Sequence, residues 1–116
     1  MVLFTITSLL FCFGILASAW DGNNIESVKE YVAYVASKEG VDVQTALSIA
    51  KCESRFNKDA IHSTEKEYSV GIFQINLKAH SSILKEEALN PFLNINWAID
   101  QMAQGKFYMW TCWNQA

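Results

Sequence analysis

The sequence predicts a small, mainly α-helical domain that also contains one short β-like or irregular segment. Three stretches of the chain repeat apolar side chains at steps of three and four residues, which is the spacing of a single buried helical face. A polar, interrupted stretch separates the second from the third. At 116 residues the chain has room for one small core and not for a second.

The first two predicted helices follow each other closely. Residues 25–39 carry the apolar face of the first helix, and Gly40 ends it. Asp42 can cap the second helix, because its carboxylate can accept hydrogen bonds from the first free backbone N–H groups. The apolar stripe of this second helix continues to Cys52 and Glu53.

The second half of the domain begins with residues 60–70, which we expect to form an irregular polar loop or a short hairpin. The run GIFQIN that follows predicts a short apolar element, either a strand or a helical turn. Residues 79–89 predict a weakly patterned helix, and Asn90-Pro91 starts another helix, since proline fits the first helical turn. The aromatic tail after Gly105 does not continue that periodicity.

An uncharged apolar run, residues 1–19, precedes the domain and ends in Ala17-Ser18-Ala19. Small residues at this spacing are the pattern that a signal peptidase accepts, so we expect a signal peptide cleaved after Ala19. A retained N-terminal membrane anchor is the main alternative, since the run is nearly long enough to span a bilayer, and a buried core helix is the third. Cleavage and anchoring both make residues 20–116 an exported domain, either secreted or periplasmic.

The cysteines agree with export. Cys12 belongs to the apolar run, which leaves Cys52 and Cys112 as an even pair in the domain. We expect a disulfide between them, with a stabilisation on the order of 4 kcal/mol in the chain-entropy treatment, and two buried thiols are the alternative. Two cysteines without nearby histidines do not make a metal-ligand set, so we expect neither a metal nor another cofactor.

Glu53 is the main candidate for chemistry. It follows the apolar residues of the second helix, so we expect it to be partly buried, and burial raises the pKa of a carboxyl group. A neutral acid can protonate a leaving glycosidic oxygen, and the resulting carboxylate can take a proton back. An isolated glutamate at a helix end is most often a solvated carboxylate, so the surrounding motifs decide its assignment.

Three motifs occur in order, namely Glu53-Ser54, Gly71-Ile72-Phe73-Gln74, and Asn90-Pro91 followed by Asn94. Together they resemble the soluble lytic transglycosylase (SLT) domain family, which has the goose-type lysozyme-like fold. The resemblance covers about residues 25–113. It implies a lysozyme-like domain, mainly α with a minor β part flanking an active-site cleft, that cleaves the glycan strand of peptidoglycan.

By that resemblance Glu53 would be the single catalytic acid and base, and Ser54 would be a structural hydroxyl at the helix end. Gly71 would let the backbone approach the sugar, and Gln74 would hydrogen-bond within the cleft. Asn76 is a weaker substrate-binding candidate, because a turn asparagine often satisfies its own backbone.

The remaining family positions carry less information. Asn90 and Asn94 are predicted to be caps rather than ligands. The family's usual C-terminal Tyr-Asn-Ala segment is absent, and Tyr108, Trp110 and Trp113 occupy that region. These aromatics could stack on sugar rings or pack in the core. For Trp110 the two interpretations have equal weight, and Tyr108 is the candidate for the family's cleft tyrosine.

The sequence is also similar to c-type lysozymes, which carry stretches like ESRFN and GIFQIN and place an aspartate two positions before the glycine. Ser69 stands at that position in this chain, and we include it among the substrate-binding candidates. Glu65 and Glu67 could supply a second carboxylate, but we expect them to be solvated loop charges. With one carboxylate, the transglycosylase reaction that closes a 1,6-anhydro ring is favoured over hydrolysis.

An inactive domain that only binds the cell wall is a rival from a different class, and the retention of Glu53 and Gln74 argues against it. The net charge of −3 and the absence of a basic stripe give no basis for nucleic-acid binding. We expect a monomer whose partner is the peptidoglycan glycan strand. An envelope or secretion machinery is a further candidate partner.

Overall fold

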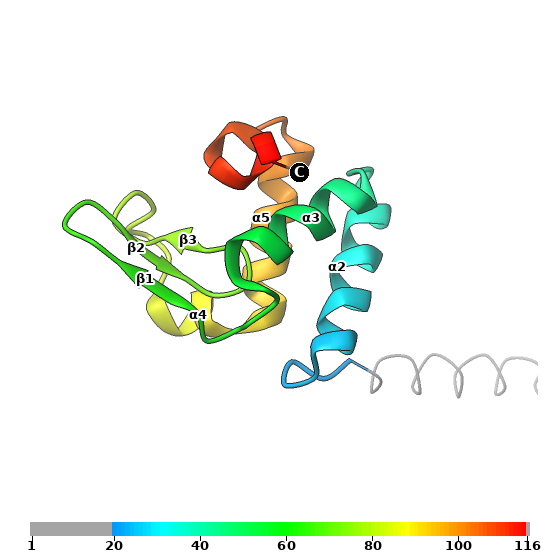
Figure 1. Ribbon diagram of the computed structural model, residues 1–116, viewed down its shortest axis with the longest axis horizontal. Coiled ribbons are helices and arrows are strands. Elements are labelled where there is room, and N and C mark those ends of the chain that lie inside the picture. The colour runs from blue at the N-terminus through cyan, green and yellow to red at the C-terminus, as the bar shows by residue number, and fades with distance from the viewer. Residues whose placement is uncertain (1–19, 116) are drawn as a thin grey trace, which may run out of the picture.

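The computed structural model describes residues 20–115 and shows a mainly helical domain with one small antiparallel sheet (Figure 1). This confirms the predicted fold class. The expected signal peptide or anchor, residues 1–19, lies outside the described residues. The elements are α2 (Ile25–Glu39), α3 (Val43–Ser54), β1 (Ile61–Ser63), β2 (Tyr68–Val70), β3 (Ile75–Asn76), α4 (Lys85–Leu89), α5 (Pro91–Ala103) and the 3-10 turns η1 (Phe107–Met109) and η2 (Thr111–Gln115).

The end of α2 and the start of α3 follow from local chemistry, as predicted. Gly40 ends α2 in the left-handed conformation, with φ of 73°, and its N–H donates to the last carbonyl groups of the helix. Asp42 caps α3, because its carboxylate accepts hydrogen bonds from both the N–H and the hydroxyl group of Thr45. These two hydrogen bonds also lower the pKa of Asp42.

The segment predicted as a loop or hairpin is a hairpin. Strand β1 pairs with β2 so that His62 lies opposite Ser69, and β2 pairs with β3 so that Ser69 lies opposite Asn76. The run GIFQIN forms a turn and then enters β3. The turn begins at Gly71, whose φ of 84° suits glycine, so this part of the sequence is neither a full strand nor a helical turn.

The helix predicted over residues 79–89 is wrong in its first half, because only Lys85–Leu89 is helical. Residues 79–84 form consecutive turns in which the N–H groups of Ala79 and His80 donate to the carbonyl oxygen of Asn76. The carboxylate of Glu87 accepts a hydrogen bond from the N–H of Leu84, which fixes the helix start at that point.

The core lies where α2, α3 and α5 meet the turn that carries GIFQIN. Its fully buried side chains include Val32, Ile49, Phe73, Ile95 and Ile99. In Figure 1 the three-stranded sheet lies at one end of the domain, and the C-terminal turns, orange to red, lie over α3 and α5. Because η2 packs against α3, the C-terminal turns lie next to the helix that carries Glu53. Within residues 20–115 we find no helix with the length and apolar character needed to cross a membrane.

Candidate active site

A cavity of about 390 Å³ lies where the end of α3, the sheet and the C-terminal turns meet. It is lined by Glu53, His62, Glu67, Ser69, Gln74, Asn76, Met109, Trp110 and Thr111. Four of the predicted site residues thus accompany Glu53 around one hollow, although they come from four separate segments of the chain. Within the described part of the chain, no group of three or more metal-ligating side chains is assembled.

Glu53 lies on the last turn of α3 and is half-buried. This burial raises its pKa, because the charged form loses solvation. A hydrogen bond from the backbone of Cys112 acts in the opposite direction by stabilising the carboxylate, and the negative charge of Glu67 raises the pKa further. The net direction is upward, which keeps the proton on Glu53 at a higher pH than for an exposed glutamate.

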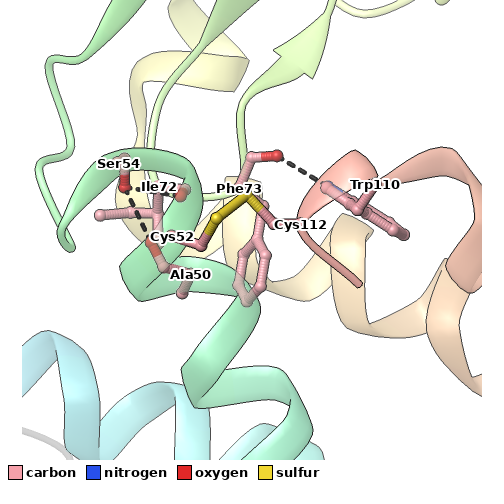
Figure 2. Close-up of a disulfide and its surroundings, with 7 residues drawn as sticks. All are labelled: Ala50, Cys52, Ser54, Ile72, Phe73, Trp110 and Cys112. Carbon is pink, nitrogen blue, oxygen red and sulfur yellow. Dashed lines mark hydrogen bonds between the residues drawn. A yellow bond between two sulfur atoms is a disulfide. The ribbon is translucent and has the colours of Figure 1, made fainter. Parts of the chain in front are cut away.

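The end of α3 is tied to the core next to Glu53. The hydroxyl group of Ser54 donates to the carbonyl oxygen of Ile72 at 2.7 Å and to that of Ala50 at 3.4 Å (Figure 2). Arg55 then leaves the helix in the left-handed conformation, with φ of 56°. Ser54 therefore has the structural position that the family resemblance implied, and it fixes the end of α3, next to Glu53, against the GIFQIN turn.

A second set of links fixes the opposite wall of the cavity. The predicted disulfide between Cys52 and Cys112 is present, with a Cα–Cα distance of 5.9 Å. Two residues earlier in the tail, the indole N–H of Trp110 donates to the carbonyl oxygen of Phe73 at 2.8 Å, as Figure 2 shows. The disulfide holds the C-terminal turns against α3, and the Trp110 hydrogen bond holds them against the GIFQIN turn. The backbone of Cys112 thus lies at Glu53.

Glu67 differs from the expectation of a solvated loop charge. Its side chain is 39% exposed and lines the cavity, whereas Glu65 is exposed and does not. The hydroxyl group of Ser69 donates to one carboxylate oxygen of Glu67 at 2.6 Å, and His62 Nε2 lies 3.4 Å from the other. Glu67 immediately precedes β2, at the end of the hairpin turn, so its contact with Ser69 depends on how that turn is built.

The two amide side chains of the cavity are engaged with the backbone. Gln74 Nε2 donates to the carbonyl oxygens of Ala60 and Gly71, each at 3.0 Å. Asn76 Oδ1 accepts hydrogen bonds from the N–H groups of Tyr68 and Lys78, each at 3.1 Å. Both side chains therefore shape the sheet side of the cavity. Asn76 also accepts a hydrogen bond from the backbone two residues later, which is the turn role that was its alternative interpretation.

Two predicted substrate-binding residues do not line this cavity. Gly71 is buried, and a Cβ atom at its position would overlap the side-chain amide of Asn94. It thus permits a close packing contact within the fold rather than an approach to a sugar. Tyr108 is 73% exposed on η1 and also lies outside the lining, so the cleft-tyrosine assignment is not supported by its position.

Trp110 lines the cavity but belongs mainly to the core. It is only 4% exposed, and its ring meets those of Phe73 and Trp97 edge-on. Little of the indole face is left for stacking on a sugar, which favours the core interpretation over the stacking one. Trp113 is stacked on Phe107 instead. Met109 and Thr111, on either side of Trp110 in the chain, are lining residues that the sequence patterns did not indicate.

The two asparagines of the third motif have different roles. Asn90 is a helix cap as predicted, since its Oδ1 accepts hydrogen bonds from the N–H groups of Phe92 and Leu93. Asn94 is not a cap, and that prediction is wrong. It is fully buried inside α5 and joins three segments, because it donates to the carbonyl oxygens of Val70 and Ala88 and accepts from the N–H of Phe73.

Comparison with known proteins identifies the family. The family model described as the transglycosylase SLT domain matches residues 30–110. No curated protein and no solved structure gives a significant match. The match spans most of the chain, from within α2 to Trp110, and includes all residues that line the cavity around Glu53 except Thr111. The chain therefore belongs to the transglycosylase SLT domain family, whose members act on peptidoglycan.

Proposed function

We propose that this protein is a lytic transglycosylase that cleaves the β-1,4 bond between N-acetylmuramic acid and N-acetylglucosamine, with Glu53 as the general acid and base. The observation that carries the proposal is the half-buried Glu53 with a raised pKa, in a cavity built by a chain of the SLT family. A carboxyl group in this state can both give and take a proton during one reaction cycle.

In the first step the carboxylic acid of Glu53 donates its proton to the glycosidic oxygen. The bond between this oxygen and C1 of the muramoyl residue breaks, and the N-acetylglucosamine side leaves as an alcohol. The sugar passes through an oxocarbenium-like state, which the substrate's own acetamido group stabilises. The Cys112 backbone N–H stabilises the glutamate anion that forms at the same time.

In the second step the Glu53 carboxylate removes the proton from the muramoyl 6-hydroxyl group. The oxygen of that hydroxyl bonds to C1 and closes a 1,6-anhydro ring, and Glu53 is again a neutral acid. No water is consumed, so the products together have the mass of the substrate. The half-burial of Glu53 fits both steps, because loss of solvation raises its pKa and lets it keep its proton to a higher pH than a fully solvated carboxylate.

Replacement of Glu53 by Gln tests the assignment. Glutamine keeps the size of the side chain but cannot transfer the proton, so Glu53→Gln should abolish clearing of a peptidoglycan gel while the circular dichroism spectrum is unchanged. Glu86→Gln, an exposed change on α4, is the matched control and should leave a full cleared band. Full activity of Glu53→Gln would refute the role of Glu53.

Hydrolysis of the same bond is the second candidate, and the presence of Glu67 in the cavity is the observation that favours it. Two carboxylates can support a water-dependent mechanism. Its products would be heavier by one water for each bond cleaved. A domain that binds the wall without cleaving it is the third candidate, and the wild-type protein would then leave no cleared band.

The substrate lies outside the cytoplasm, which agrees with the proposed export of the domain. The disulfide is also of the kind that persists in oxidising compartments. We therefore propose a secreted or periplasmic site of action, reached through the N-terminal signal peptide or anchor.

A further inference from the structure

The side chain of Glu67 is held by partners on both strands of the first hairpin. Ser69, in β2 two residues after Glu67, donates to one carboxylate oxygen, and His62, opposite Ser69 on β1, approaches the other at 3.4 Å. Ser69 is only 3% exposed, so its hydroxyl has little access to water and directs its hydrogen bond to the carboxylate.

Glu67 faces the same hollow as Glu53, and their charges interact. Within the described chain, Glu53, His62 and Glu67 are the titratable side chains that line this cavity. Lys78 does not compete for the carboxylate, because its ammonium group donates to the carbonyl oxygens of Thr64 and Glu65 outside the cavity. The charge of Glu67 is therefore not neutralised by a lysine or arginine of the cavity lining.

We propose that Glu67 is a second functional carboxylate of the cleft, positioned by Ser69 and His62 to stabilise the positive charge that develops on the sugar during bond cleavage. The inference rests on the proposed glycosidic cleavage, since that reaction produces an oxocarbenium-like state. A preoriented charge in a partly water-excluded cavity interacts with such a state more strongly than a solvated one. The same charge helps to keep Glu53 protonated before the reaction.

The first test measures Glu53 itself and does not require activity. In Glu67→Gln the amide keeps the shape of the side chain and its bond from Ser69 but removes the charge. The pKa of Glu53, followed by NMR of its side-chain carboxyl carbon, should fall. Glu65→Gln removes the same charge from the same hairpin outside the cavity and should leave that pKa unchanged. An equal response of the two variants would overturn the proposal.

The second test measures the reaction with purified peptidoglycan. Glu67→Gln should lower kcat by a factor on the order of 10² with little change in KM, and the basic limb of its pH–rate profile should move to lower pH. Glu67→Asp keeps the charge and should recover part of the rate, and Ser69→Ala should reduce it about tenfold. Wild-type-like kcat in Glu67→Gln would overturn the inference. Inactive wild-type protein would refute the proposed function, and the NMR titration would still decide whether Glu67 acts on Glu53.

Discussion

Replacing the buried amide of Asn94 should destabilise the fold more than any conservative change on the surface. The side chain is 0% exposed and makes three hydrogen bonds to backbone groups, at 2.8 Å to Phe73 N, 3.0 Å to Val70 O and 2.9 Å to Ala88 O. Asn94→Ala leaves these buried groups without a partner, and each such group costs about 1–3 kcal/mol. We expect a total loss of about 3–5 kcal/mol, a large part of the roughly 5–15 kcal/mol that stabilises a domain.

The assay is equilibrium urea denaturation of the oxidised protein, with Asn96→Ala as the matched control on the same helix. Asn96 is exposed and accepts one hydrogen bond, from the hydroxyl of Tyr31, so its loss should cost about 1 kcal/mol or less. Asn94→Asp should be at least as harmful as Asn94→Ala, because it keeps the acceptor for Phe73 and loses both donors. A loss below about 1 kcal/mol for Asn94→Ala, equal to the control, would refute the reasoning.

Three further predictions concern the disulfide, Glu53 and Gly71. Replacing both Cys52 and Cys112 by Ser removes a link between residues 60 positions apart, and the free energy of unfolding in urea titrations should fall by about 4 kcal/mol. Lytic activity should also be lost. Unchanged activity would contradict the role of the disulfide in building the cavity wall. The pKa of Glu53 is raised in the folded state, so Glu53 favours folding at low pH and this contribution is lost as pH rises through the raised pKa. Glu53→Gln should therefore raise Tm at neutral pH, and the gain should disappear in acid, as calorimetry at several pH values would show. Gly71→Ala should lower the free energy of unfolding by more than about 2 kcal/mol, since it combines a positive φ with overlap of the buried Asn94 amide. Gly40→Ala has a positive φ in open space and should lower it by about 1 kcal/mol. Equal shifts of Tm for the two variants would contradict this.

The parts of the fold that depend on neighbouring residues were predictable from the sequence. Gly40 and Asp42 mark the boundary between α2 and α3 because each acts on backbone groups within one turn. The disulfide was predictable from cysteine parity together with the expectation of an exported domain. The family was predictable from the three ordered motifs, and the family match confirms it, while the catalytic role of Glu53 stays a proposal.

The parts that depend on pairing across the chain were not predictable. Asn94 was predicted to be a cap, but its partners lie in three separate segments, namely Val70 in β2, Phe73 in the following turn and Ala88 in α4, up to 24 residues away. Glu67 has the appearance of a loop charge until β1 and β2 are paired, because only the register places its partner His62 opposite Ser69. Tyr108 shows the converse case, in which an aromatic residue that suits a sugar site is directed into solvent by a 3-10 turn.

In the proposed reaction, Glu53 acts as a proton donor and acceptor without the help of water. Mass spectrometry of the muropeptides released from purified peptidoglycan in isotopically labelled water tests this claim directly. We expect 1,6-anhydromuramoyl ends that contain no label and are lighter by one water than hydrolysis products. Reducing muramoyl ends that carry the label would contradict it, and would assign the chain to hydrolysis with water as the acceptor.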